Sequence, residues 1–199
     1  MLEAFDHSLF QNMKAPADLA GVALNAPRFV ADWVIFAAPA ILALVWLFGT
    51  TGDRRAAIRA TFAATAGLAT SAIISALDFH PRPFMDGVSH NFLHHVADSS
   101  FPSDHATVLF ALAFSLWLTR SPAPRRAGAI LLAAALAVGW ARIFLGAHYP
   151  LDVLAGAGIG LAFAVTFALN PLRRGVERFS ELLDRAYVAL GAVLVRRAR

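Results

Sequence analysis

Long apolar runs separated by short polar segments dominate this chain. A helix needs about 20 apolar residues to cross the roughly 30 Å of hydrocarbon in a membrane, and a shorter helix needs tilt or shielding by protein. The pattern predicts five such helices, of which the third is short unless its polar flank is shielded inside a bundle. Their ranges are 33–49, 60–77, 106–119, 127–147 and 151–169. We therefore expect an all-α membrane protein.

The two ends of the chain are amphipathic rather than continuously apolar. Leu2, Phe5, Leu9 and Met13 recur at helical spacing, which predicts a helix lying in the membrane interface. The C-terminal end mixes arginine and glutamate with a ten-residue apolar run that is too short to span. Because no repeat, low-complexity tract or linker interrupts the chain, we expect one domain over residues 1–199. Its parts are an interfacial segment 1–31, a transmembrane core 33–169 and a basic amphipathic segment 172–199.

Composition supports a membrane protein and excludes several other classes. Of the 199 residues, 58% are hydrophobic and 15% charged, and the mean hydropathy is +0.61, which a soluble domain rarely reaches. With no cysteine, the chain has neither disulfides nor thiolate metal sites. The formal charge of +4 does not indicate nucleic-acid binding, because the basic residues lie between apolar runs instead of along one polar stripe.

The basic residues are distributed unequally between the two ends of the predicted helices. Thirteen of the 17 lysines and arginines follow the first, third or fifth span. Cytoplasmic segments of membrane proteins are enriched in these residues. We therefore predict that the protein spans the inner membrane of a bacterium and that this side faces the cytoplasm. Residues 78–105 and the turn 147–150 should then face the periplasm or the exterior, with every histidine except His7 in or beside this outer layer.

Three polar clusters lie at this outer edge, where ionisable groups are costly and are functional candidates. The first is Arg82, which stands between two prolines just after the second span. Each proline disfavours helix at the residue before it, so Arg82 is predicted to lie on an extended, stiff segment. The guanidinium there could bind phosphate oxygens in a bidentate manner, or it could extend to lipid headgroups.

The second cluster begins the third predicted helix. Pro102, Ser103 and Asp104 are typical of a helix start, with the free N–H groups and the positive end of the helix dipole facing outward. An anion would bind at such a terminus. Asp104 has the wrong charge for an anion site, and we interpret it as the N-cap. His105 lies in the first turn, either as an ordinary interfacial residue or as an acid that protonates a leaving group.

The third cluster lies between the fourth and fifth spans. It comprises Arg142 at the outer end of the fourth, His148 in the turn and Asp152 at the start of the fifth. Asp152 has two interpretations: an acid favoured by the helix dipole, or an acceptor for one ring N–H of His148 that leaves the other ring nitrogen free to attack phosphorus. Together the clusters supply anion-binding groups, a nucleophile and a proton donor, which is what phosphoryl transfer without a metal requires.

At these residues the chain resembles the type 2 phosphatidic acid phosphatase superfamily. The family pattern is lysine, six residues, Arg-Pro; then Pro-Ser-Gly-His; then Ser-Arg, five residues, His, three residues, Asp. The sequence segments around these motifs are similar to those of the undecaprenyl-diphosphatase branch, in which Asp commonly replaces the motif glycine. They are PRPF, FPSDHATVLF and GAHYPLDVLAG. The resemblance implies a helical membrane bundle and a phosphohistidine intermediate, with no metal or other cofactor.

Residue by residue, the resemblance implies roles for six side chains. It implies His148 as nucleophile, Asp152 as its orienting partner and His105 as general acid. The residues that it implies for phosphate binding are Arg82, Ser103 and Arg142.

Two positions depart from the family pattern. The family lysine falls at Ser75, and the serine before the third-motif arginine is Ala141. One expected phosphate contact is therefore missing. His80 or a water could replace the lysine, and Asp104, at the glycine position of the motif, is a second auxiliary candidate.

The expected function is hydrolysis of undecaprenyl diphosphate to undecaprenyl phosphate and phosphate, which would recycle the lipid carrier of peptidoglycan biosynthesis. The expected partner is this membrane lipid, with no nucleic acid, and the oligomeric state is left open. A second enzymatic interpretation is a phosphatidic acid or phosphatidylglycerophosphate phosphatase with the same residues. Outside the enzymes, His90, His94 and His95 could form a metal-binding or transport site, and a purely structural membrane protein is the remaining alternative.

Overall fold

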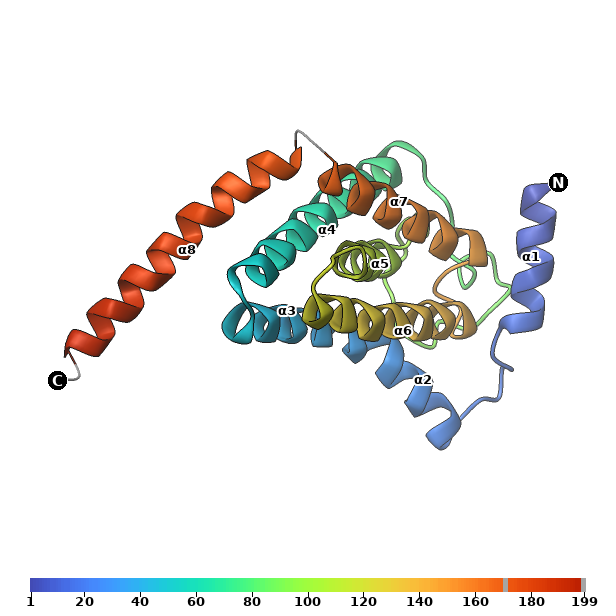
Figure 1. Cartoon of the computed structure of the whole chain (residues 1–199). Coiled ribbons are helices and arrows are strands. Elements are labelled where there is room, and N and C mark those ends of the chain that lie inside the picture. The colour runs from blue at the N-terminus through green and yellow to red at the C-terminus, as the bar shows by residue number, and fades with distance from the viewer. Residues whose placement is uncertain (170–171, 198–199) are drawn as a thin grey trace.

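The computed structural model describes residues 1–169 and 172–197, and within these it is helical with no strand (Figure 1). Eight α-helices and one short 3-10 helix follow one another along these two described ranges. They are α1 (Leu2–Met13), α2 (Gly21–Trp33), η1 (Val34–Phe36), α3 (Ala37–Phe48), α4 (Thr51–Leu77), α5 (Asp104–Trp117), α6 (Pro122–Phe144), α7 (Pro150–Ala168) and α8 (Leu172–Arg197). The all-α prediction is confirmed.

Among the described residues, four helical stretches are long and apolar enough to cross a membrane. Their ranges are Gly21–Phe48, Thr51–Leu77, Pro122–Phe144 and Pro150–Ala168. The third predicted span is the shorter helix α5, of 14 residues. The first two predicted starts are wrong, because the helices begin earlier than their apolar runs. In α4, a capping box between Thr50 and Asp53 starts the helix nine residues before Ala60. This additional part of the helix contains arginines, which favour helix.

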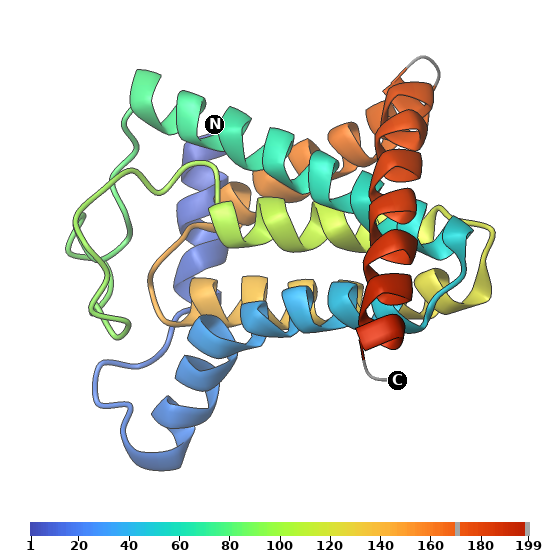
Figure 2. The same cartoon turned by 90° about the vertical axis from the view of Figure 1, so that its left-hand side faces the viewer.

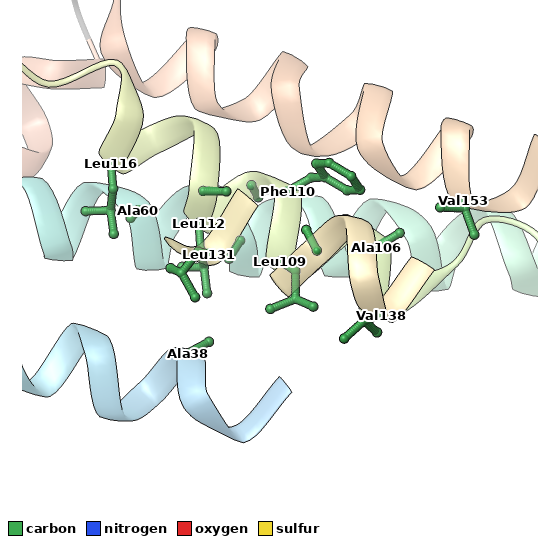
Figure 3. Close-up of a cluster of buried hydrophobic side chains, with 14 of the residues drawn as sticks. Ala38, Ala60, Ala106, Leu109, Phe110, Leu112, Leu116, Leu131, Val138 and Val153 are labelled. Carbon is green, nitrogen blue, oxygen red and sulfur yellow. The ribbon is translucent and has the colours of Figure 1, made fainter. Parts of the chain in front are cut away.

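Helix α5 lies at the centre of the bundle, between α4, α6 and α7 (Figure 1). Its side chains Leu109, Leu112 and Leu116 form the buried core, together with residues of the neighbouring helices (Figure 3). The surrounding protein shields the short α5 from lipid, which explains how 14 residues are accommodated.

Glycines of α7 allow the close approach of this helix to α5. A Cβ at Gly156 would lie 2.6 Å from the carbonyl oxygen of Ser103, and one at Gly160 would lie 2.7 Å from the backbone nitrogen of Ala111. Small residues at such contacts let helix backbones approach closely in a membrane. The start of α5 is thereby held directly against the start of α7.

The loop of residues 78–103, helix α1 and the α6–α7 turn gather at one end of the bundle (Figure 2). The N-terminal helix packs here with Phe10 fully buried, and the ring of His7 stacks on Tyr149 with their centroids 4.6 Å apart. His7 therefore belongs to the same layer as the other histidines, contrary to the prediction that set it apart. The α3–α4 and α5–α6 turns lie at the opposite end.

Candidate active site

The three polar clusters meet at a cavity of about 500 Å³ in the loop end of the bundle. Arg82, His105, Arg142 and His148 all line it, from the loop, from α5, from α6 and from the α6–α7 turn. Ligand sites in proteins commonly enclose about 300–1,000 Å³. The cavity is therefore large enough for a phosphorylated headgroup.

His148 is held in the α6–α7 turn with its ring 3% exposed. Its Nδ1 lies 2.9 Å from the carbonyl oxygen of Ser100, and its Nε2 lies 3.3 Å from Nη1 of Arg82. Because a carbonyl oxygen only accepts hydrogen bonds, Nδ1 bears the proton, and the unprotonated Nε2 accepts from Arg82. The unprotonated nitrogen of His148 is therefore the one beside Arg82.

The pKa of His148 is lowered well below its ordinary value of 6.5, by burial first and then by the positive charges of Arg142 and Arg82. A lowered histidine pKa favours the neutral ring at neutral pH. The neutral ring is the form in which Nε2 can form a bond to phosphorus.

Asp152 contacts both groups that the sequence suggested for it. Its Oδ2 accepts the backbone N–H of Tyr149 at 2.7 Å, as part of a capping box at the start of α7. The same oxygen lies 3.5 Å from Nδ1 of His148, farther than the Ser100 carbonyl. The Ser100 carbonyl, which residue types could not reveal, is therefore the nearer acceptor, and Asp152 supports the same side of the ring.

Arg82 is buried, with its guanidinium bonded to protein on three sides. Nε donates to Asp98 Oδ1 at 2.8 Å, Nη1 to the Ala147 carbonyl at 2.8 Å and Nη2 to the Ser99 carbonyl at 3.1 Å. These bonds hold the side chain at the cavity instead of letting it extend to lipid headgroups. Arg82 therefore lines the cavity, and its binding of an anion there stays a prediction.

The start of α5 differs from the prediction in one respect. Ser103 is the N-cap residue and Asp104 the first helical residue, so the interpretation of Asp104 as N-cap is wrong. Asp104 instead accepts a hydrogen bond of 2.6 Å from the Ser71 hydroxyl of α4. The physical reason is that this hydrogen bond joins the Asp104 carboxylate to α4, and the carboxylate therefore does not cap the start of α5.

Two buried polar groups at the site have no hydrogen-bond partner within the described residues. They are the Ser103 hydroxyl and Nε of Arg142. Nη1 of Arg142 lies 3.4 Å from the Ala31 carbonyl and 3.4 Å from Nε2 of His105. Of these two residues, Arg142 lines the cavity, whereas Ser103 is buried behind it. Because buried donors are costly when unpaired, the Arg142 side of the cavity is suited to an anion.

His80, suggested as a replacement for the family lysine, does not line the cavity. Its ring tilts over Phe101, with Nδ1 3.8 Å from Asp78. Ser75, at the family lysine position, and His95 do line the cavity. Ser75 donates its hydroxyl to the Phe101 carbonyl at 2.8 Å. The spacing of motifs could not have indicated His95, which reaches the cavity only through the fold of the loop.

The histidine-based metal site is not supported by the arrangement of side chains. Within the described part of the chain, no three His, Asp or Glu residues are grouped so that they could hold a metal ion. His90 lies on Phe92, and His94 lies 3.3 Å from an Arg28 nitrogen. Of the three histidines in question, only His95 lines the cavity.

Comparison with known proteins identifies the family of this chain. The model of the PAP2 superfamily matches residues 56–175. A protein of Escherichia coli (strain K12), named provisionally as the undecaprenyl-diphosphatase YbjG, is 38% identical over 81% of this chain and 80% of its own length. The undecaprenyl-diphosphatase BcrC of Bacillus subtilis (strain 168) is 36% identical over 81% of each chain. The crystal structure of Aquifex aeolicus LpxE has a similar fold, with a TM-score of 0.59 at 24% identity over 83% of this chain and 92% of that one. The chain belongs to the PAP2 superfamily.

Proposed function

We propose that this protein hydrolyses a polyprenyl diphosphate, with undecaprenyl diphosphate as the substrate and His148 as the nucleophile. The observation that most supports this is the buried His148 ring, whose Nδ1 is held by the Ser100 carbonyl and whose Nε2 lies 3.3 Å from Nη1 of Arg82 at the cavity. The names of the similar E. coli and B. subtilis proteins support the diphosphate. A phosphatidic acid or phosphatidylglycerophosphate substrate is the alternative with the same catalytic residues.

In the proposed reaction, Arg82, Arg142 and the Ser103 hydroxyl bind the oxygens of the terminal phosphate. Nε2 of His148 forms a bond to its phosphorus, while the bond from phosphorus to the bridging oxygen breaks and the electron pair leaves with the lipid monophosphate. The Ser100 carbonyl and Asp152 stabilise the Nδ1–H of the resulting phosphohistidine.

Water completes the reaction. Its oxygen forms a bond to phosphorus, the bond to Nε2 breaks, and inorganic phosphate is released. His105, which lines the cavity, donates a proton to the leaving oxygen in the first step and accepts one from water in the second. Neither step uses a metal, because Arg82 and Arg142 bind the negatively charged oxygens of the phosphate.

A second cavity supports a lipid substrate. It has a volume of about 460 Å³, lies between η1, α3, α4 and α5, and shares His105 with the catalytic cavity. Its walls are almost entirely apolar and include Phe36, Leu42, Leu68 and Leu112. An isoprenoid chain in this groove would place its diphosphate at the polar cavity.

The distribution of charge supports a catalytic cavity on the outer side of the bacterial inner membrane. Arg54, Arg55 and Arg59 begin α4 at the end opposite to the loop of residues 78–103 (Figure 2). Arg120 and Arg173 line a further cavity with Arg55 and Arg59 at that end. Because cytoplasmic segments are enriched in arginine, the basic end is assigned to the cytoplasm and the catalytic cavity to the periplasm or exterior.

Phosphate release from undecaprenyl diphosphate by the detergent-purified protein in excess EDTA tests this proposal. We expect full activity of the wild type in EDTA and loss of at least about a thousandfold in His148→Ala, since the nucleophile acts as a unit with its partners. Loss of wild-type activity in EDTA would contradict the metal-free route. Release from phosphatidic acid or phosphatidylglycerophosphate but not from the diphosphate would support the alternative substrate class.

A further inference from the structure

The catalytic cavity contains a histidine that the proposed reaction does not use. His95 lies on the loop of residues 78–103 and lines the same cavity as Arg82, His105, Arg142 and His148. It is not part of the three sequence clusters, and its side chain is 24% exposed. A half-buried histidine beside two arginines needs an explanation, because burial near positive charge is unfavourable for its protonated form.

The structure holds His95 in place through its backbone. The side-chain amide of Asn91 donates to the His95 carbonyl at 2.8 Å, and its oxygen accepts the His95 backbone N–H at 2.9 Å. Arg28 of α2 anchors the same loop by donating from Nε to the Phe92 carbonyl at 2.6 Å. His95 is therefore positioned by reciprocal bonds and does not merely happen to lie near the cavity.

The ring of His95 is connected to the site on one side and open on the other. Nδ1 lies 3.2 Å from the Val96 carbonyl and 3.5 Å from Asp98 Oδ1, the atom that accepts from Arg82. Nε2 makes no hydrogen bond to any described residue. One nitrogen is thus oriented by protein, and the other is available to a ligand.

We propose that His95 binds the leaving phosphate of the substrate, the one attached to the lipid, and so makes the site selective for diphosphates over monophosphates. This inference rests on the proposed function. Arg82, Arg142 and Ser103 serve the phosphate that is transferred to His148. A diphosphate adds a second charged group, and Ser75, at the family lysine position, has its hydroxyl engaged with the Phe101 carbonyl. His95 is the remaining basic side chain lining the cavity.

The protonation of His95 would follow the ligand. Burial, and then the charges of Arg82 and Arg142, lower the pKa of His95, while the Val96 carbonyl and Asp98 oppose them. The other titratable groups that face the cavity are Asp104, His105 and His148. A bound diphosphate introduces negative charge, which favours the protonated ring and allows Nε2–H to donate to a phosphate oxygen.

The test compares undecaprenyl diphosphate with undecaprenyl phosphate as substrates. For His95→Ala we expect kcat/KM to fall about tenfold or more on the diphosphate and less than about threefold on the monophosphate, the size of one lost hydrogen bond to a charged group. His95→Lys should retain the preference for the diphosphate. The matched control is His90→Ala, a histidine of the same loop that does not line the cavity. Equal losses on both substrates, or no loss on either, would overturn the inference.

A binding measurement separates this inference from the proposed function. A prenyl methylenediphosphonate and the corresponding prenyl phosphonate have no cleavable bridge, so their affinities do not depend on turnover. We expect the wild type to bind the diphosphonate more tightly and His95→Ala to lose most of that difference. A wild type that shows the preference without cleaving the diphosphate would contradict the proposed function alone. A wild type without the preference, or a variant that keeps it, would contradict the role of His95.

Discussion

At the scale of single residues, the site is defined by how each polar atom is satisfied. The Ser100 carbonyl determines which nitrogen of His148 bears the proton, and three bonds to protein hold Arg82 against the other nitrogen. Nε of Arg142 and the Ser103 hydroxyl are buried and make no hydrogen bond to a described residue. The proposed phosphate site would therefore need little rearrangement when a phosphate binds.

The ionisation of His148 gives a prediction that needs no substrate. Burial and the two arginines lower its pKa below the ordinary 6.5, so as the pH falls the ring should remain neutral past the point at which a free histidine is half protonated. Nitrogen NMR of histidine-labelled protein, with His148→Gln for assignment, should show a neutral ring with the proton on Nδ1 at pH 6.5. A ring that is half protonated at or above pH 6.5, or one protonated on Nε2 alone, would contradict the proposed geometry.

Much of the site could be predicted from residue order, and the rest could not for physical reasons. Ionisable groups at the edge of apolar helices are costly, and the sequence alone therefore identifies Arg82, His148 and Asp152 as functional candidates. Ser100 acts through its backbone carbonyl, which every residue type possesses. His95 reaches the cavity because the loop folds back on itself, a long-range arrangement that local patterns do not contain.

At the scale of helices, the site depends on the contact between α5 and α7. Ser103 at the start of α5 donates its backbone N–H to the Asp152 carbonyl in α7 at 3.0 Å. Helix α1 supports the same region, since the Asp6 carboxylate accepts the backbone N–H of Leu151 at 3.0 Å. Helix packing thus joins Ser103, the proposed phosphate-binding residue of α5, to Asp152, the proposed partner of the nucleophile on α7.

Replacing two nearby glycines of α7 tests this packing. In Gly156→Ala the new Cβ would lie 2.6 Å from the Ser103 carbonyl oxygen and 3.0 Å from the Thr107 nitrogen, so we expect a loss of roughly 1–3 kcal/mol in unfolding free energy. The control Gly158→Ala, where the Cβ meets nothing within 4 Å, should be neutral or slightly stabilising, since alanine favours helix. Thermal unfolding in detergent measures both. Similar melting temperatures for the two variants would contradict the described contact.

The helical elements were more predictable in number than in extent. Apolar runs mark the part of each helix that lies in lipid, and so all five predicted spans correspond to helices. They do not mark where a helix begins, because α4 extends through its arginines and the first span starts at Gly21 rather than at Trp33. The brevity of α5 is explained only by its central position among other helices.

At the scale of the whole molecule, two ends of one bundle have different chemistry. The proposed catalytic cavity and the loop of residues 78–103 lie at one end, and the α3–α4 and α5–α6 turns, with arginines in or beside them, lie at the other (Figure 2). An apolar groove connects to the catalytic cavity through His105. This arrangement suits a substrate whose chain stays in the membrane while its phosphates remain at one surface.

The orientation can be measured because the chain has no cysteine of its own. A cysteine introduced at His90, exposed in the loop, should react with a membrane-impermeant maleimide in intact cells after permeabilisation of the outer membrane alone. A cysteine at Ala123, exposed in the first turn of α6, should react only after the inner membrane is opened. The reverse labelling pattern would place the catalytic cavity in the cytoplasm and contradict the assignment.

In the proposed reaction, the Nε2 atom of His148 forms a bond to the terminal phosphorus of the lipid diphosphate. Acid-sensitive, base-stable phosphohistidine should be detectable by mass spectrometry after rapid denaturation in base of enzyme turning over undecaprenyl diphosphate. We expect the phosphoryl group on His148 in the wild type and none in His148→Gln. Increased trapping is expected if His105→Gln slows attack by water. Turnover without any phosphorylated histidine, or a phosphoryl group on another residue, would contradict the account.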